Sequence, residues 1–203
     1  VPTSSPPAPA LPLWMVSLIG VGTVLLLYGG LGYVGLVLWR KLKLPDLWTE
    51  TVTNRQRFLI PALVGVAIGF GLIVADLGFS QFNGVGRLIH PPFPASLVAT
   101  IAAAIGEEIL FRLFFISFWS WLIGAVLLRG RGQPVVYWSV AVLSALLFAV
   151  AHLPALMYML GVSELSQLSP VLLVQIILLN GVVSLFAAHY YRKSGFLAPV
   201  GIH

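Results

Sequence analysis

Long apolar runs dominate this sequence and limit the folds that the chain can adopt. Charged residues make up 8% of the 203 residues and hydrophobic residues 59%. An ordinary soluble domain carries about 25% charged residues, so this chain cannot cover a water-facing surface. About 20 apolar residues in a helix cross the hydrocarbon core of a bilayer. The sequence therefore predicts an all-α, polytopic transmembrane helix bundle, a multi-pass integral membrane protein in contact with the lipid bilayer.

Five apolar runs are long enough to span a membrane, and a sixth begins near the end of the sequence. We predict about six transmembrane helices, the last incomplete in this sequence, at residues 13–39, 58–79, 95–128, 135–160, 170–191 and from 196 onward. A kink is expected at Pro154. Small residues in the first helix are expected to allow close helix contact. They are Gly20, Gly22, Gly29, Gly30, Gly32 and Gly35.

Three parts of the chain differ in character. Residues 1–12 are rich in proline, serine and alanine and are predicted to form a flexible tail. Residues 13–94 are expected to hold two transmembrane helices, an interfacial connector and a loop, and residues 95–203 a core region. Basic residues gather in the first, third and fifth connections, which predicts that these connections lie in the cytoplasm and the N-terminus outside it. Their scatter beside apolar runs excludes a nucleic-acid partner.

Three charged residues interrupt the third apolar run. A charge at mid-membrane costs at least ~2.5–3.5 kcal/mol, so Glu107, Glu108 and Arg112 need partners. Glu108 and Arg112 are four residues apart, share a helix face and are predicted to pair. Glu107 lies about 100° around the helix from Glu108. It is therefore expected to point into the bundle as a separate, functional carboxylate.

Two histidines extend this polar group to other helices. His152 follows Phe148 by four residues, and His203 closes the stretch after Gly195. A single histidine on an apolar helix is more often a hydrogen-bonded core residue than a functional one. Together with Glu107, however, the two histidines could activate a water by general base catalysis, or hold a divalent metal such as zinc.

Two further polar residues in the spans allow simpler interpretations. Asn180 is expected to bond across helices or to support the site. Asp76 lies near the end of its span, where it can reach water, and we expect it to be solvated.

The charged and histidine motifs follow one another in a recognisable order. They are Glu-Glu-x-x-x-Arg at 107–112, Phe-x-x-x-His at 148–152 and Gly-Phe-Leu-Ala-Pro-Val-Gly-Ile-His at 195–203. In this order they resemble the motifs of the CAAX-protease and bacteriocin-processing family of intramembrane endopeptidases, also called Abi proteins, which includes the type II CAAX prenyl endopeptidases. The resemblance covers residues 95–203, which would then form the protease core.

The resemblance implies a hydrolytic mechanism. Glu107 and His152 would activate a water that attacks a peptide carbonyl, and His203 would stabilise the oxyanion. Family members are catalogued as metalloproteases, so the same three side chains are candidate ligands for a divalent, zinc-like metal. The substrate would be a membrane-anchored or prenyl-type protein or peptide. Structural roles around the site would fall to Glu108, Arg112, Phe148 and Asn180.

Two alternatives and one geometric condition stay open at this point. The chain could be a catalytically silent relative that serves as a subunit or assembly factor of a larger membrane complex, such as a pigment–protein complex. It could also be a small proton-coupled transporter with Glu107 as the proton site, although no inverted repeat is visible. His203 lies ~12 Å into its helix and Glu107 ~33 Å before Arg129. The two can meet only if the third helix extends beyond the membrane, tilts or breaks.

Overall fold

The computed structural model describes residues 11–88 and 91–203, and all regular secondary structure in those ranges is helical. Five of the helices are long and apolar enough to cross a membrane. The prediction of an all-α, polytopic helix bundle is therefore confirmed. The predicted tail, residues 1–12, lies almost entirely outside the described residues. The five spans are Leu13–Lys41, Arg55–Phe79, Ala95–Leu127, Gln133–Leu160 and Pro170–Ser194.

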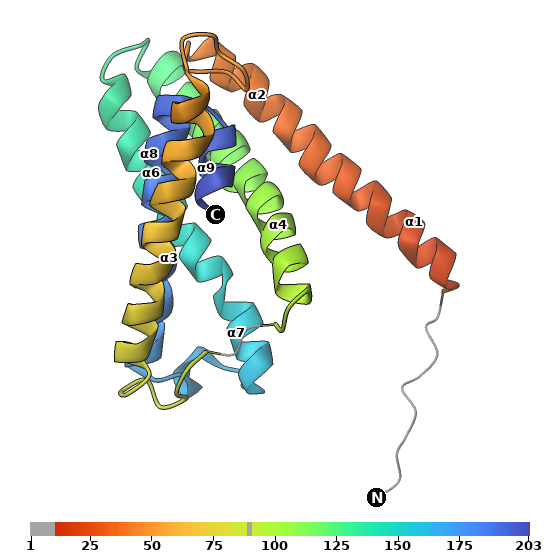
Figure 1. The fold of residues 1–203 in the computed structure, drawn as a ribbon. Coiled ribbons are helices and arrows are strands. Elements are labelled where there is room, and N and C mark those ends of the chain that lie inside the picture. The colour runs from red at the N-terminus through yellow and green to blue at the C-terminus, as the bar shows by residue number, and fades with distance from the viewer. Residues whose placement is uncertain (1–10, 89–90) are drawn as a thin grey trace, which may run out of the picture.

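The first span packs on the bundle through only one of its ends. It consists of α1 (Leu13–Val24), η1 (Leu25–Gly30) and α2 (Leu31–Lys41). Figure 1 shows α2 against the bundle and α1 leading away from it. No residue of α1 is buried, and its side chains are suited to lipid contact.

The glycines of this first span also differ between the end that packs on the bundle and the end that leads away from it. A Cβ at Gly35 would collide with the backbone carbonyl of Leu113, and one at Gly32 would lie 3.3 Å from the Ile109 side chain. These two glycines therefore allow the close helix contact predicted for all six. For Gly20, Gly22, Gly29 and Gly30 close contact stays a prediction, since no described atom lies within 4 Å of a Cβ built at any of them.

The second span begins at η2 (Arg55–Leu59) and continues as α3 (Ile60–Phe79). The connector before it is fixed by Arg57, whose guanidinium lies 3.9 Å from the centre of the Trp48 ring and donates to the Thr49 carbonyl at 2.7 Å. Tryptophan is enriched at membrane–water interfaces, and its ring attracts a stacked cation. The contact therefore agrees with an interfacial connector.

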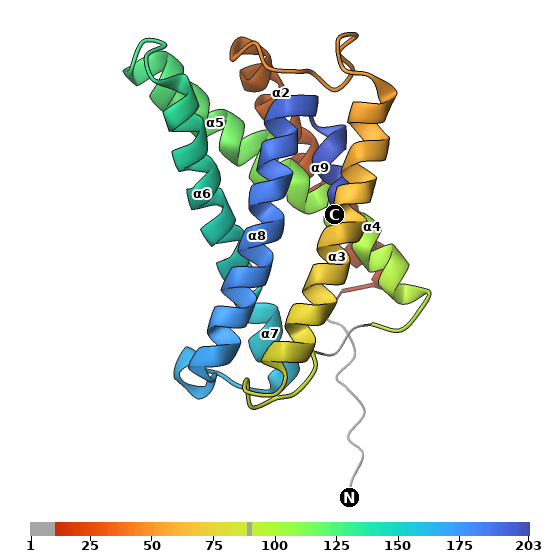
Figure 2. The same ribbon diagram turned by 60° about the vertical axis from the view of Figure 1, so that its left-hand side comes forward.

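The third span is one unbroken helical stretch of 33 residues. At 1.5 Å per residue it is about 50 Å long, more than the ~30 Å hydrocarbon core. It leans across the bundle in Figure 2 and includes two segments of wider π-helical winding. Glu107 and His203 can therefore meet because the third span is long and tilted, and the helix does not need to break. Its parts are α4 (Ala95–Glu108), η3 (Ile109–Ile116), α5 (Ser117–Ser120) and η4 (Trp121–Leu127).

The fourth and fifth spans form the centre of the bundle. α6 (Gln133–Ala151) packs along α8 (Pro170–Ser194), and Tyr137 donates a 2.6 Å hydrogen bond to the Ala188 carbonyl between them. The predicted kink is present, because α6 ends at Ala151 and α7 (Leu153–Leu160) begins around Pro154. The short helix η5 (Leu165–Gln167) precedes α8.

A sharp return after α8 brings the last helix into the bundle. Gly195 adopts φ +82°, and a Cβ there would meet the Asp46 and Pro45 carbonyls. α9 (Leu197–Ile202) then runs back beside α3, where Gly65 lies against the backbone of Ile202.

The predicted basic connections share one end of the bundle. Residues 42–54, residues 128–132 and the turn between α8 and α9 lie together at the top of Figure 1, and residues 161–169 lie at the opposite end. This arrangement fits the charge pattern. Which end faces the cytoplasm stays a prediction.

Candidate active site

Residues of the first and last motifs come from two separate parts of the chain that meet beside α9. Glu107 and Glu108 close α4, Arg112 lies in η3, and His203 follows α9. α4 contacts α9 directly. The structure therefore brings the first and last motifs together, although 95 residues separate Glu108 from His203.

Glu108 and Arg112 form a fully buried ion pair. Arg112 Nη1 lies 3.2 Å from Glu108 Oε1, and both side chains are 0% exposed. Their contact is the i, i+4 pair that the spacing predicts. The guanidinium also lies 4.7 Å from the centre of the Phe148 ring, so a cation–π contact adds to the ion pair.

The buried pair leaves several polar atoms without a hydrogen bond. Within the described residues, no acceptor is aligned with Arg112 Nε, Nη1 or Nη2, and no donor with Glu108 Oε2. The 3.2 Å contact is thus an ion pair by distance and not a well-aligned hydrogen bond. Buried polar groups are nearly always satisfied, and exceptions occur at catalytic sites.

Glu107 takes no part in that pair. Its Oε2 lies 3.7 Å from His203 Nε2, which is too long for a hydrogen bond, and the described residues offer this oxygen no other partner. The Glu107 side chain is 31% exposed, whereas Glu108 is sealed. The two adjacent glutamates therefore occupy different environments, as the 100° rotation between them predicts.

His203 lies between the two glutamates. Its Nδ1 is 3.4 Å from Glu108 Oε1, while its Nε2 faces Glu107. Each ring nitrogen thus faces a carboxylate oxygen. The imidazole is in a position to donate a proton or a hydrogen bond toward a group bound beside Glu107.

His152 also lies beside Phe148. Its Nδ1 is 2.7 Å from the Phe148 carbonyl, which can only accept, so Nδ1 carries the hydrogen and a neutral ring leaves Nε2 as an acceptor. The Phe148 ring centre is 4.8 Å from that of His152 and 6.3 Å from that of His203. In the described residues no hydrogen bond or ion pair joins His152 to Glu107.

The three candidate metal ligands do not converge as a ligand set. Nowhere in residues 11–88 and 91–203 do three histidine, cysteine, aspartate or glutamate side chains come close enough to hold a metal. Glu107 and His203 are neighbours, but the Phe148 ring lies beside both histidines. The described arrangement of Glu107, His152 and His203 does not fit a shared metal ion. Metal binding by these three residues stays a prediction.

Asn180 lies away from the motif residues. Its side-chain nitrogen donates to the Ile176 carbonyl at 2.9 Å, one turn earlier in α8. The same side chain lines a cavity that also contains Asp76 and Arg87. Its predicted contact with the site is not present in this arrangement.

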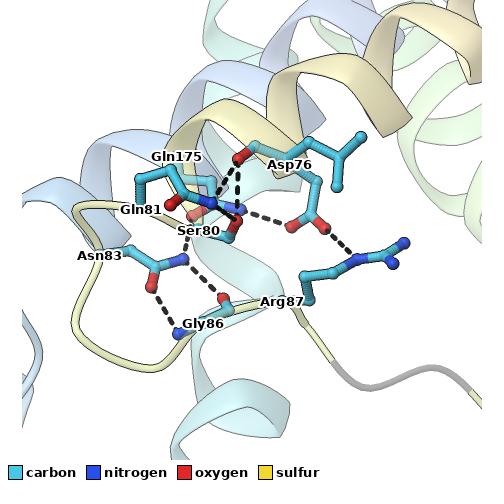
Figure 3. Close-up of polar contacts among 8 residues, drawn as sticks. Asp76, Ser80, Gln81, Asn83, Gly86, Arg87 and Gln175 are labelled. Atoms are coloured by element: carbon cyan, nitrogen blue, oxygen red, sulfur yellow. Dashed lines mark hydrogen bonds and ion pairs between the residues drawn. The ribbon is translucent and has the colours of Figure 1, made fainter.

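Sequence reasoning missed a second polar group, the Asp76 cluster, formed by Asp76, Asn83 and Gln175 (Figure 3). Gln175 Nε2 donates to Asp76 Oδ1 at 2.9 Å, and Asn83 Nδ2 donates to Gln175 Oε1 at 2.8 Å. The expectation that Asp76 is solvated is wrong, because its side chain is only 14% exposed. A glutamine inside the fifth apolar run was the signal that could have revealed the cluster.

Comparison with known proteins agrees with the motifs. Residues 89–203, more than half of the chain, match the family model described as type II CAAX prenyl endopeptidase Rce1-like. No curated protein and no solved structure gave a match. With its membrane-spanning helices and this match, the chain belongs to the Rce1-like family of type II CAAX prenyl endopeptidases.

Proposed function

We propose that this protein is an intramembrane endopeptidase that cleaves a membrane-anchored, prenyl-type protein or peptide by attack of a water on a peptide carbonyl. The observation that carries the proposal is the environment of Glu107. Glu107 lies inside a membrane span, its side chain is partly exposed, and its buried Oε2 has no hydrogen-bond partner among the described residues. An intramembrane carboxylate of this kind is energetically costly and is usually functional. Family membership supports the reaction class, and the site supports the roles of individual residues.

In the proposed reaction, Glu107 accepts a proton from the water as the water oxygen attacks the carbonyl carbon. His152 assists from its unprotonated Nε2 as a second proton acceptor. His203 donates a hydrogen bond to the oxyanion that develops on the carbonyl oxygen. When the tetrahedral intermediate collapses, the C–N bond breaks and the proton returns to the leaving amine. No step in this scheme uses a metal.

Glu108 and Arg112 have a positioning role in this proposal. Their buried pair fixes the end of α4 next to η3, and Glu108 Oε1 also faces His203 Nδ1. The pair would therefore hold both Glu107 and His203 in place without touching the substrate.

The test is a cleavage assay with purified protein in lipid nanodiscs and a prenylated, fluorogenic peptide. We expect Glu107→Gln to lower kcat/KM by about 10²–10⁴, the usual contribution of a general base. Glu164→Gln changes an exposed glutamate in a loop and serves as the matched control. Unchanged cleavage in Glu107→Gln would refute the proposed role of Glu107.

The same assay tests the metal. Since the three candidate ligands do not converge, we expect a strong chelator of zinc to leave cleavage unchanged. Loss of cleavage on chelation, with recovery on adding zinc, would instead show that cleavage requires the metal.

One observation favours a second candidate function, a catalytically silent family member that acts as a subunit of a larger membrane complex. Among the described residues no hydrogen bond or ion pair joins His152 to Glu107, so these two residues do not form a completed catalytic pair. This alternative predicts that the wild-type protein cleaves none of a panel of membrane-anchored peptides, and that Glu107→Gln leaves its association with other membrane proteins unchanged.

A further inference from the structure

A cavity of about 560 Å³ lies between α3 and α8, and none of the residues of the proposed reaction lines it. Its volume falls within the range of about 300–1,000 Å³ that is usual for ligand sites. Gly69, Leu72 and Ile73 form an apolar wall, whereas Asp76 and Arg87 contribute opposite charges. The cavity thus combines an apolar part with a charged part.

The charged part lies nearer to the end of the membrane span. Asp76 is three residues from Phe79, the last residue of α3, and Arg87 follows in the next connection. Gly69 is seven residues earlier than Asp76, or about 10 Å deeper at 1.5 Å per residue. The cavity therefore runs from the level of lipid headgroups toward the hydrocarbon core.

The two charges are held in place but only loosely paired. Gln175 fixes Asp76 through Oδ1, while Asp76 Oδ2 lies 3.9 Å from Arg87 Nε, too far for a hydrogen bond (Figure 3). The Arg87 side chain is 68% exposed. Both groups can therefore take a charged partner without losing a strong mutual bond.

From this pattern we propose that the cavity binds a phospholipid whose headgroup carries an ammonium group beside its phosphate, as in an ethanolamine phospholipid. The phosphate pairs with Arg87, the ammonium with Asp76, and one acyl chain lies along Gly69 and Leu72. Charge complementarity favours this lipid over an anionic one. The Asp76–Arg87 site is formally neutral, so an anionic headgroup would leave a net charge, whereas an ammonium–phosphate headgroup matches both residues.

Two glycines of α3 provide a matched test of the apolar wall. A Cβ at either Gly69 or Gly71 meets no atom within 4 Å, but only Gly69 lines the cavity. Each protein is incubated with vesicles of equal parts ethanolamine, choline and anionic glycerol phospholipids, extracted in mild detergent and analysed by native mass spectrometry. We expect Gly69→Leu to lower the retained ethanolamine lipid about tenfold, because leucine occupies the space of the acyl chain. Gly71→Leu is expected to retain as much as wild type.

A second variant tests the headgroup without depending on the glycines. Asp76→Asn keeps an oxygen acceptor for Gln175 but removes the negative charge, so we expect it to lose the preference for the ethanolamine lipid while still binding phospholipid. Equal retention in Gly69→Leu and Gly71→Leu would overturn the proposal. So would a wild-type preference for the anionic lipid, or an ethanolamine preference that survives Asp76→Asn.

Discussion

The two polar groups inside the membrane spans are satisfied to very different degrees. In the Asp76 cluster, hydrogen bonds of 2.8–2.9 Å link each side chain to the next. In the motif cluster, formed by Glu107, Glu108, Arg112 and His203, charged atoms approach to 3.2–3.7 Å and several of them lack a hydrogen bond within the described residues. A satisfied network holds helices and loops in place, whereas an unsatisfied one keeps groups available for chemistry. The difference agrees with the proposed reaction at Glu107 and His203, whereas the hydrogen bonds of the Asp76 cluster hold α3, α8 and the connection after α3 together.

The largest effect on stability should come from breaking the buried ion pair. Arg112→Met leaves Glu108 buried without its partner, which costs about 3–5 kcal/mol in such pairs. Thermal unfolding in detergent measures the loss. The double variant Glu108→Gln, Arg112→Met should recover much of it, because no charge is then left unpaired. A single variant as stable as wild type would show that the pair is not the structural part of the motif cluster.

A smaller loss is expected in the Asp76 cluster. Gln175→Leu removes the amide that donates to Asp76 and accepts from Asn83. Leaving such buried groups unsatisfied costs about 1–3 kcal/mol. Since this cluster has no role in the proposed reaction, kcat/KM of the folded protein should stay as in wild type. If cleavage fell as far as in Glu107→Gln, the claim that the Asp76 cluster has no role in the reaction would be wrong.

The smallest effect on stability is expected at the exposed ion pair between Arg40, at the end of the first span, and Asp46 in the connector after it. Partial burial acts to raise the pKa of Asp46, but hydrogen bonds from Arg40 and the Leu47 N–H outweigh it and lower that pKa. An aspartate with a lowered folded-state pKa stabilises the protein above its unfolded pKa of about 3.9, and this contribution is lost as pH falls through the folded pKa. Exposed pairs contribute about 0.2–1 kcal/mol, so Asp46→Asn should destabilise by no more than this at pH 7 and less at pH 3. An equal loss at both values would exclude the ion pair as its cause.

Much of the fold follows from the sequence because it depends on local patterns. The five apolar runs mark the spans, Pro154 marks the kink, and the i, i+4 spacing brings Glu108 to Arg112. Each of these needs only the chain within one helix.

Contacts between helices could not be predicted in the same way. Asp76 and Gln175 are 99 residues apart, and their contact depends on how α3 and α8 are rotated about their axes. A helix that is apolar on all sides gives no periodic signal for that rotation. The same reason explains why Asn180 was expected near the motifs but lines the cavity that contains Asp76 and Arg87.

The central claim is that the two adjacent glutamates have different roles: Glu107 acts in the reaction, and Glu108 stabilises the structure. The most direct measurement determines kcat/KM and the unfolding midpoint together for Glu107→Gln and Glu108→Gln. We predict that Glu107→Gln loses about 10²–10⁴ in kcat/KM at an unchanged midpoint, whereas Glu108→Gln lowers the midpoint because Arg112 is left buried and unpaired. A Glu107→Gln protein that cleaves like wild type, or that loses stability as Glu108→Gln does, would contradict it.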